Sequence, residues 1–164
     1  MALGIESKAF DNLLRTQLFP YQKEGILFAV RAGRSIIADD MGLGKTVQAI
    51  GAAELLIRDF GIEKILIVCP TSLKYQWKSE IEKFTNRTVT VIEGLSKLRE
   101  AQYQDSSAYK IVSYNSVVND IHIVEKLDLD LVILDEAQRI KNWKTRTSRH
   151  VKNIPSRYAL VLTG

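Results

Sequence analysis

A short stretch near the N-terminus carries the residue types that bind phosphate. The apolar run Ser35–Ala38 leads into a turn in which Gly42 and Gly44 precede Lys45 and Thr46. Glycines let backbone N–H groups converge on an anion, and a helix that begins after them directs its positive end to the same point. The lysine would then reach the β- and γ-phosphates of a nucleotide, and the threonine hydroxyl would bind Mg²⁺.

This turn matches the general phosphate-loop pattern incompletely. The pattern G-x-x-x-x-G-K-[ST] has a glycine where this chain has Asp39. A glycine-rich turn that opens an ordinary helix is therefore the alternative interpretation. The predicted nucleotide-binding residues of the loop are Asp40, Met41, Gly42, Leu43, Gly44, Lys45 and Thr46.

A pair of acidic residues follows a second apolar run and can complete such a site. Asp135 and Glu136 come directly after Leu131–Leu134. The carboxyl ends of parallel strands share one edge of a sheet, so this pair is expected near Lys45 and Thr46. Asp135 is placed to hold Mg²⁺, directly or through water, and Glu136 to orient or deprotonate the water that attacks the γ-phosphate. Alternatively, the pair caps the next helix.

The spacing of apolar residues predicts the elements that position these side chains. The runs Lys64–Cys69 and Leu131–Leu134 are apolar on both alternating faces, which is typical of central strands in a parallel sheet covered by helices on both sides. Strands are predicted at 36–38, 64–69, 88–92, 110–113, 131–134 and 158–162. Helices are predicted at 5–17, from Pro20 to Gly33, at 45–60, from a cap at Thr71 or Ser72 to Phe84, at 96–104, 117–124 and 148–154. We predict an α/β fold, a mostly parallel, doubly wound sheet of about six strands with helices on both faces.

Length and composition agree with a single domain over 1–164. The chain has 164 residues and a net charge of +4. No apolar run approaches the roughly 20 residues of a membrane helix, and the N-terminus lacks an export signal, so we expect no membrane association. The one cysteine, Cys69, lies in an apolar run and is expected to be a buried hydrophobe. With two scattered histidines, no zinc site is proposed.

The C-terminal segment is basic and free of acidic residues. It is expected either to form a solvated basic face or to lie near nucleic acid. Its basic residues are Arg139, Lys141, Lys144, Arg146, Arg149, Lys152 and Arg157.

Two segments together resemble a known family. Asp39–Thr46 and Asp135–Asn142 look like motifs I and II of the Swi/Snf-type superfamily 2 ATPases. Leu18–Gln22 is similar to the nucleotide-binding segment of that family, although Phe19 stands where the family often has arginine. The resemblance covers nearly the whole chain and implies a RecA-like P-loop NTPase lobe that uses ATP and Mg²⁺. It also implies that Gln22 recognises adenine; otherwise Gln22 is a solvent-facing residue on the first helical turn.

Three further segments resemble motifs of the same family. Cys69–Trp77 is similar to motif Ia, Ile111–Tyr114 to motif Ib, and Leu160–Gly164 to the opening of motif III. By that resemblance, the residues that contact the DNA backbone are Pro70, Thr71, Ser72 and Tyr114. Trp77 recurs at helical spacing with other apolar residues, so we expect it in the core more than as a stacking platform.

The resemblance implies the first lobe of a DNA-dependent ATPase that translocates along duplex DNA and remodels what is bound to it. In this family a second RecA-like lobe supplies an arginine finger, so 1–164 is expected to be a fragment with almost no activity alone. The implied partners are double-stranded DNA, the second lobe and DNA-bound proteins. The expected location is the cytoplasm with the nucleoid, or the nucleus in a eukaryote. The alternatives are a strand-separating superfamily 2 DNA or RNA helicase and a non-catalytic ATP- and nucleic-acid-binding module.

Overall fold

Six parallel strands form a single sheet. The structure, a computed structural model, describes residues 4–38, 44–140 and 146–164. The strands lie in the order β1-β6-β5-β2-β4-β3, and each neighbouring pair runs parallel. The predicted α/β fold is therefore confirmed, with every strand pair of the sheet parallel.

The predicted strands and most predicted helices are present within a few residues of their expected bounds. The strands are β1 Arg34–Ala38, β2 Ile65–Cys69, β3 Val89–Val91, β4 Tyr109–Ser113, β5 Leu129–Leu134 and β6 Ser156–Thr163. The helices are α1 Pro20–Ala32, α2 Lys45–Phe60, α3 Lys74–Phe84, α4 Ser96–Tyr103, α5 Tyr114–Asn119, α6 Ile121–Val124 and α7 Arg146–Lys152. Short 3₁₀ turns cover Lys8–Phe10, Thr71–Leu73 and Ala137–Arg139.

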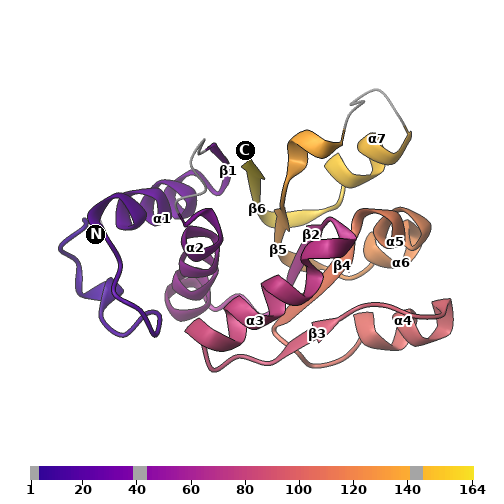
Figure 1. The fold of residues 1–164 in the computed structure, drawn as a ribbon, viewed down its shortest axis with the longest axis horizontal. Helices are drawn as coiled ribbons and strands as arrows, with labels where there is room; N and C mark the ends of the chain where they lie inside the picture. The colour runs from indigo at the N-terminus through magenta and orange to yellow at the C-terminus, as the bar shows by residue number, and fades with distance from the viewer. Residues whose placement is uncertain (1–3, 39–43, 141–145) are drawn as a thin grey trace.

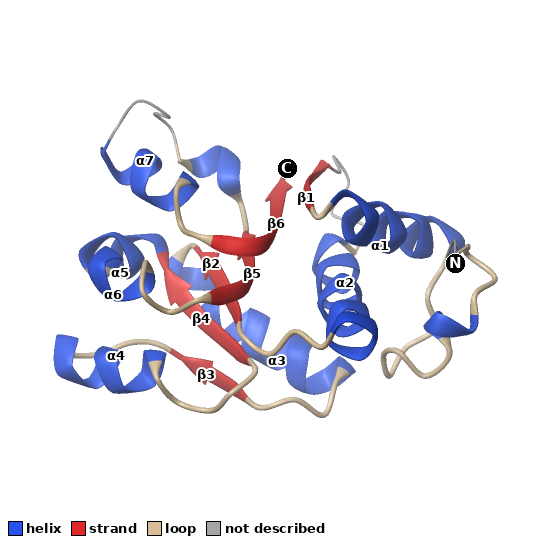
Figure 2. Cartoon of the chain, turned by 180° about the vertical axis from the view of Figure 1, so that it is seen from behind, coloured by secondary structure: helices blue, strands red, loops and turns tan. Residues whose placement is uncertain are grey.

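Helices cover both faces of the sheet, as the apolar strands predicted. In β2, Ile65, Ile67 and Cys69 belong to a core shared with α1, α2 and α3, while Leu66 and Val68 belong to a second core. That second core also takes side chains from α4 to α7, helices that lie together at the right of the view in Figure 1. Seen from behind, the strands lie between these groups of helices (Figure 2). The alternation of side chains along each strand therefore builds two cores from one sheet.

Helices α1 and α2 pack closely, and this contact places the N-terminal segment against the rest of the lobe. A Cβ atom on Gly51 would lie 2.4 Å from Cδ1 of Ile26, and one on Gly25 would lie 2.0 Å from Oε1 of Gln48. A Cβ atom at either position would therefore displace the facing side chain, Ile26 or Gln48. The contact matters for the site, because α1 carries Gln22 and α2 begins with Lys45.

The helix predicted over 5–17 is wrong. Only Lys8–Phe10 forms a 3₁₀ turn, and Asn12 has a left-handed backbone with φ of 56° that interrupts any helix. The backbone carbonyls of this segment accept hydrogen bonds from Arg58 of α2. The apolar side chains are nevertheless buried as expected: Phe10, Leu13, Leu14 and Leu18.

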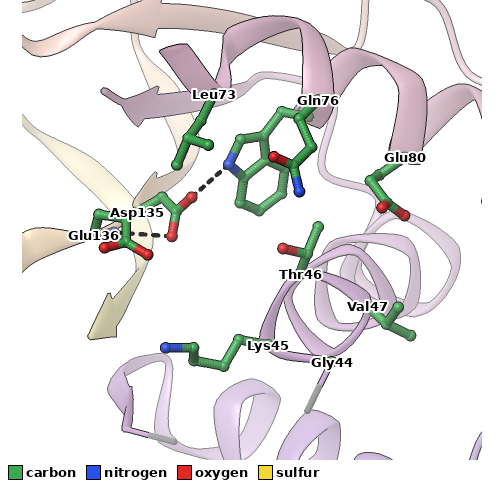
Figure 3. A pocket seen from close by; sticks show the side chains of 10 residues that line it. Gly44, Lys45, Thr46, Val47, Leu73, Gln76, Glu80, Asp135 and Glu136 are labelled. Carbon is green, nitrogen blue, oxygen red and sulfur yellow. Dashed lines mark hydrogen bonds between the residues drawn. The ribbon is translucent and has the colours of Figure 1, made fainter. Parts of the chain in front are cut away.

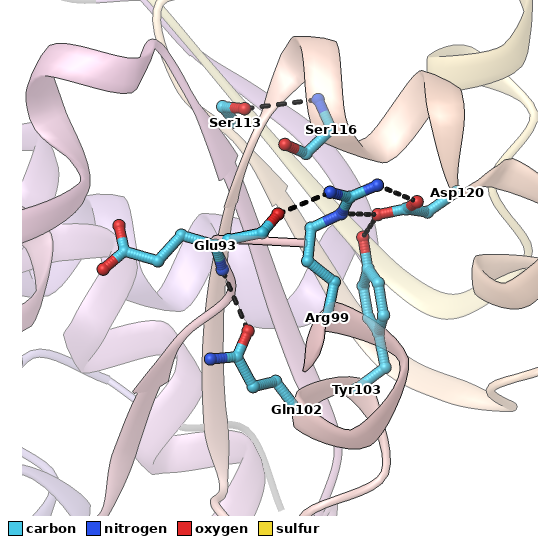
Figure 4. Close-up of polar contacts among 8 residues, drawn as sticks. Glu93, Arg99, Gln102, Tyr103, Ser113, Ser116 and Asp120 are labelled. Carbon is cyan, nitrogen blue, oxygen red and sulfur yellow. Dashed lines mark hydrogen bonds and ion pairs between the residues drawn. The ribbon is translucent and has the colours of Figure 1, made fainter. Parts of the chain in front are cut away.

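Two further details differ from the prediction. Thr71 and Ser72 do not cap α3; they form a 3₁₀ turn before it, and no side chain caps either element. The helix predicted over 117–124 is divided into α5 and α6 at Asp120. The buried Asp120 carboxylate accepts two hydrogen bonds from Arg99 and one from Tyr103, which holds the break in place (Figure 4).

Candidate nucleotide and metal site

A cavity of about 320 Å³ lies at the carboxyl edge of the sheet. It is lined by the start of α2, by α3 and the turn before it, and by the residues that follow β5 (Figure 3). Its lining residues are Gly44, Lys45, Thr46, Val47, Leu73, Gln76, Trp77, Glu80, Asp135 and Glu136. The fold thus brings together Lys45, Thr46, Asp135 and Glu136, which the sequence predicted at one sheet edge.

The side of the cavity that the sequence predicted to bind phosphate is the first turn of α2. Gly44 precedes this helix with a left-handed φ of 87°, and Lys45 and Thr46 are its first residues. The positive end of the helix dipole therefore points at the cavity. The Lys45 ammonium donates a hydrogen bond of 2.7 Å to the backbone oxygen of Thr163 at the end of β6. The remaining predicted loop residues, Asp40, Met41, Gly42 and Leu43, lie outside the described residues.

Asp135 is held by four hydrogen bonds. Its Oδ2 accepts from Nε1 of Trp77 at 2.7 Å, and its Oδ1 accepts from the backbone N–H of Glu136 at 2.8 Å. Its own N–H donates to the Val68 oxygen at 2.8 Å, and its carbonyl accepts from the Tyr114 hydroxyl at 2.6 Å. Burial raises the pKa of Asp135 above its usual value, and the bonds from Trp77 and Glu136 partly offset this.

Glu136 lies at the start of the 3₁₀ turn Ala137–Arg139, in a left-handed conformation with φ of 53°. Its side chain makes no capping hydrogen bond to that turn, so the alternative of an acidic helix cap receives no support from it. Instead, its Oε2 accepts from Nε2 of Gln138 at 2.6 Å, and Oε1 of Gln138 accepts from the Gly164 N–H at 3.1 Å. Gln138 thus joins the ends of β5 and β6, a role that sequence reasoning missed.

Gln22 is buried beside Gly44, at the turn before α2. Its Oε1 accepts the Phe19 N–H at 2.9 Å, and its Nε2 lies where a Cβ atom on Gly44 would be 2.6 Å away. It is therefore not a solvent-facing residue, contrary to the alternative interpretation. Phe19 and Tyr21 stack beside it with ring centroids 6.1 Å apart, and both rings are exposed.

Gly44→Ala is expected to destabilise the fold by about 1 kcal/mol and also to weaken nucleotide binding. The first effect comes from a left-handed alanine, and the second from the contact of its Cβ with Gln22. Gly61→Ala is the matched control, because Gly61 has φ of 68° at the other end of α2 and open space around its Cβ position. Chemical denaturation and ATP titration of both variants test this. Equal ATP affinity in the two variants would contradict it.

The predicted DNA-contacting residues lie along the same edge as the cavity. Pro70, Thr71 and Ser72 follow β2, and both hydroxyl-bearing side chains are exposed. Tyr114 follows β4 and is half-buried, with its hydroxyl donating to Asp135. Trp77 is 2% exposed, which confirms its predicted place in the core. A buried indole N–H needs an acceptor, but the sequence did not show that this acceptor is Asp135.

The basic C-terminal residues do not all gather at this edge. Arg157 lies at the start of β6, on the opposite edge of the sheet, and pairs with Asp130 at 3.6 Å. Arg149 and Lys152 are exposed on α7. The others, Lys141, Lys144 and the side chains of Arg139 and Arg146, lie outside the described residues.

The one cysteine of the chain, Cys69, is buried, as predicted. Burial raises the pKa of Cys69 to about 12, as expected for an inert buried thiol. Within 4–38, 44–140 and 146–164, no cluster of three or more His, Cys, Asp or Glu side chains could hold a metal ion. The cavity lining has three carboxylates, Glu80, Asp135 and Glu136; among them Asp135, with the Thr46 hydroxyl, would suit Mg²⁺ bound mainly by phosphates and water. The described helices include none with the length and apolar character to span a membrane.

Comparison with known proteins gives consistent matches. The SNF2-related domain family matches residues 21–164. The DNA annealing helicase and endonuclease ZRANB3 of Homo sapiens is 35% identical over 94% of this chain. The DNA repair and recombination protein RAD54B of Gallus gallus is 30% identical over 99% of it. The chain spans only 15% and 20% of the lengths of these two relatives, respectively.

A solved structure shares the fold. The Sulfolobus solfataricus SWI2/SNF2 ATPase core in complex with dsDNA superposes with a TM-score of 0.83 and 28% sequence identity. The match covers 92% of this chain and 32% of that chain.

Proposed function

Because the chain belongs to the SNF2-related domain family, we propose that 1–164 form the ATP-binding lobe of a DNA-dependent ATPase that translocates along duplex DNA and remodels protein–DNA complexes. The observation that carries this proposal is the meeting of Lys45 and Thr46 with Asp135 and Glu136 around one cavity. One relative is named a DNA repair and recombination protein, which supports a location in the compartment that holds DNA.

Each residue of the cavity has a proposed role. Lys45 would bind the β- and γ-phosphates, and Glu136 would orient or deprotonate the attacking water. Thr46 and Asp135 would hold Mg²⁺, which neutralises charge on the phosphates when bound. Gln22, buried beside Gly44, would recognise adenine.

Nucleotide binding would also change a contact at the end of β6. Lys45 now donates to the Thr163 oxygen, and phosphate oxygens would compete for the same ammonium group. The adjacent Gly164 N–H is bonded to Gln138, which in turn binds Glu136. The end of β6 is thus connected to both halves of the proposed site.

Duplex DNA is the proposed partner of the turn after β2. The exposed hydroxyls of Thr71 and Ser72 suit contacts to phosphate, which position a protein on DNA without reading sequence. A solved relative is named as a complex with dsDNA, which supports this assignment. We further propose that a second RecA-like lobe completes the nucleotide site and the DNA track.

Strand separation is the second candidate function. A Mycoplasma pneumoniae relative, 35% identical over 91% of this chain, is named an ATP-dependent helicase. A strand-displacement assay with the two-lobed protein distinguishes the candidates, because a translocase that remodels nucleoprotein moves along duplex DNA without separating its strands.

Lys45→Ala tests the proposed nucleotide site. Loss of one charge-assisted contact to phosphate, worth about 1.5–3 kcal/mol, is expected to weaken Mg-ATP binding about 10- to 100-fold. Titration calorimetry measures this, with circular dichroism to show that the fold is retained. Lys97→Ala, on the exposed face of α4, is the control for loss of a positive charge. Unchanged Mg-ATP affinity in Lys45→Ala would mean that the turn before α2 is structural.

A further inference from the structure

We propose that Trp77 is a positioning residue for the metal site, whose indole N–H fixes the carboxylate of Asp135 in the orientation that binds Mg²⁺. The inference rests on the proposed function, because it takes Asp135 as a Mg²⁺ ligand. Trp77 would not touch nucleotide phosphate or the metal; it would act through Asp135.

The contact between the two side chains is short and buried. Nε1 of Trp77 lies 2.7 Å from Oδ2 of Asp135 (Figure 3). The exposed fractions are 2% for Trp77 and 9% for Asp135. Hydrogen bonds to a charged acceptor are stronger than neutral ones, and low local dielectric strengthens them further. Water cannot easily replace this donor, so the bond restrains the carboxylate.

The donor itself is fixed by packing. Trp77 lies on α3 and belongs to the core that α3 shares with α1 and α2. Its indole has one N–H and no acceptor, so its orientation toward Asp135 is the one in which this polar atom is satisfied. An aromatic ring that is packed on a helix moves less than a long flexible side chain. The hydrogen bond therefore fixes the Asp135 carboxylate relative to α3.

Other contacts of Asp135 do not perform the same task. The N–H that binds Oδ1 belongs to the next residue, Glu136, and moves with the chain of Asp135 itself. Val68 and Tyr114 hold only the backbone of Asp135. Among the described residues, Trp77 is thus the side chain from another element that hydrogen-bonds the carboxylate. Without it, the backbone would stay in place and the carboxylate would keep only the hydrogen bond from the adjacent Glu136 N–H, which leaves Oδ2 unrestrained.

The binding of Mg²⁺ depends on the orientation of the Asp135 carboxylate. Mg²⁺ requires nearly octahedral geometry with oxygen ligands at about 2.0–2.1 Å. Groups that orient a metal ligand typically contribute about 10- to 100-fold to metal affinity or activity. Loss of the indole N–H is therefore expected to raise the Mg²⁺ concentration needed for half-maximal stimulation of ATP binding about 10-fold. Binding of ATP in excess EDTA, which depends on Lys45 and not on the metal, should stay unchanged.

Trp77→Phe and Tyr103→Phe form a matched pair of variants. Each removes a buried aromatic donor from a carboxylate, since the Tyr103 hydroxyl donates to Asp120 at 3.0 Å on the other face of the sheet (Figure 4). Calorimetric ATP titrations at increasing Mg²⁺ compare both with the unsubstituted chain. We expect the Mg²⁺ concentration for half-maximal stimulation to rise about 10-fold in Trp77→Phe. In Tyr103→Phe it should rise less than about twofold, because Tyr103 does not orient a proposed metal ligand. Equal Mg²⁺ dependence in the two variants would overturn the inference alone, whereas ATP binding without any Mg²⁺ dependence in the unsubstituted chain would overturn the proposed metal site as well.

A measurement on the unsubstituted chain covers the case in which Trp77→Phe does not fold. The chain has two tryptophans, so Trp143→Phe assigns the two indole N–H signals in an NMR spectrum. Slow hydrogen exchange of the Trp77 indole, retained in the presence of Mg-ATP, is the expected result. Fast exchange of that indole after Mg-ATP is added would show that the bond breaks in the loaded site and would overturn the inference.

Discussion

Glu136→Gln is expected to leave ATP binding intact and to lower ATP turnover about 100- to 10,000-fold, the usual contribution of a general base. The measurement requires a protein that pairs this lobe with a second RecA-like lobe, because turnover is the readout. The two effects separate because Lys45, Thr46 and Asp135 are proposed to hold the phosphates and the metal, whereas Glu136 is proposed to act only on water. Calorimetry with Mg-ATP and a steady-state ATPase assay give the two quantities.

The structure makes this substitution conservative. A glutamine at position 136 still offers an amide oxygen to Nε2 of Gln138, so the bond of 2.6 Å can be kept while the negative charge is lost. Glu100→Gln on the exposed face of α4 removes the same charge away from the cavity and should leave turnover unchanged. If Glu136→Gln turned over ATP as fast as Glu100→Gln, the assignment of Glu136 would be refuted.

The parts of the fold that were predictable have local causes. Helix α2 runs from Lys45 to Phe60, as predicted, because Gly44 and Gly61 flank it with left-handed backbones and its apolar residues keep helical spacing. Every residue of β2 is apolar, and this pattern correctly predicted that the strand is buried on both faces. Once these strands were taken as parallel, the meeting of Lys45 with Asp135 followed from their shared edge.

The parts that were missed depend on partners far along the chain. The apolar spacing within 5–17 predicted a helix, but Arg58 binds the carbonyls of this segment and Asn12 turns the backbone. The break at Asp120 is held by Arg99, which is 21 positions away. Arg58 thus supplies donors that a continuous helix would have supplied internally, whereas Arg99 binds the side-chain carboxylate of Asp120 at the break.

The meeting of Lys45, Thr46, Asp135 and Glu136 at one sheet edge was predicted, whereas the residues that hydrogen-bond to them were not. Motif spacing identified Asp135 and Glu136, whereas Trp77 was predicted only as a core residue. Its hydrogen-bond partner, Asp135, lies 58 positions away in the sequence. The spacing of apolar residues predicts that a side chain is buried, but it does not predict which group accepts its N–H. Gln138 was missed for the same reason, since its bond to Gly164 depends on how β5 and β6 pair.

The addition of a second RecA-like lobe, covalently or in trans, is expected to raise DNA-stimulated ATP turnover about 1,000- to 100,000-fold over that of the 164-residue chain. Phosphoryl transfer at such sites depends on positioning and charge stabilisation, and an arginine finger alone contributes a factor of this size. No arginine of the described residues lines the cavity. Among the described residues, Lys45 is the cation that lines the cavity, and it lies on the side proposed to bind phosphate.

The arginine is therefore proposed to come from the second lobe, across the open side of the cavity. The chain by itself should bind Mg-ATP weakly and hydrolyse it at a barely measurable rate, with or without duplex DNA. The matched control is a second lobe in which the arginine that faces the γ-phosphate is replaced by alanine; it should restore DNA binding but not turnover. Turnover near 10 s⁻¹, an ordinary enzyme rate, by the chain alone with duplex DNA would place the missing charge within 1–164 and refute the need for a partner lobe.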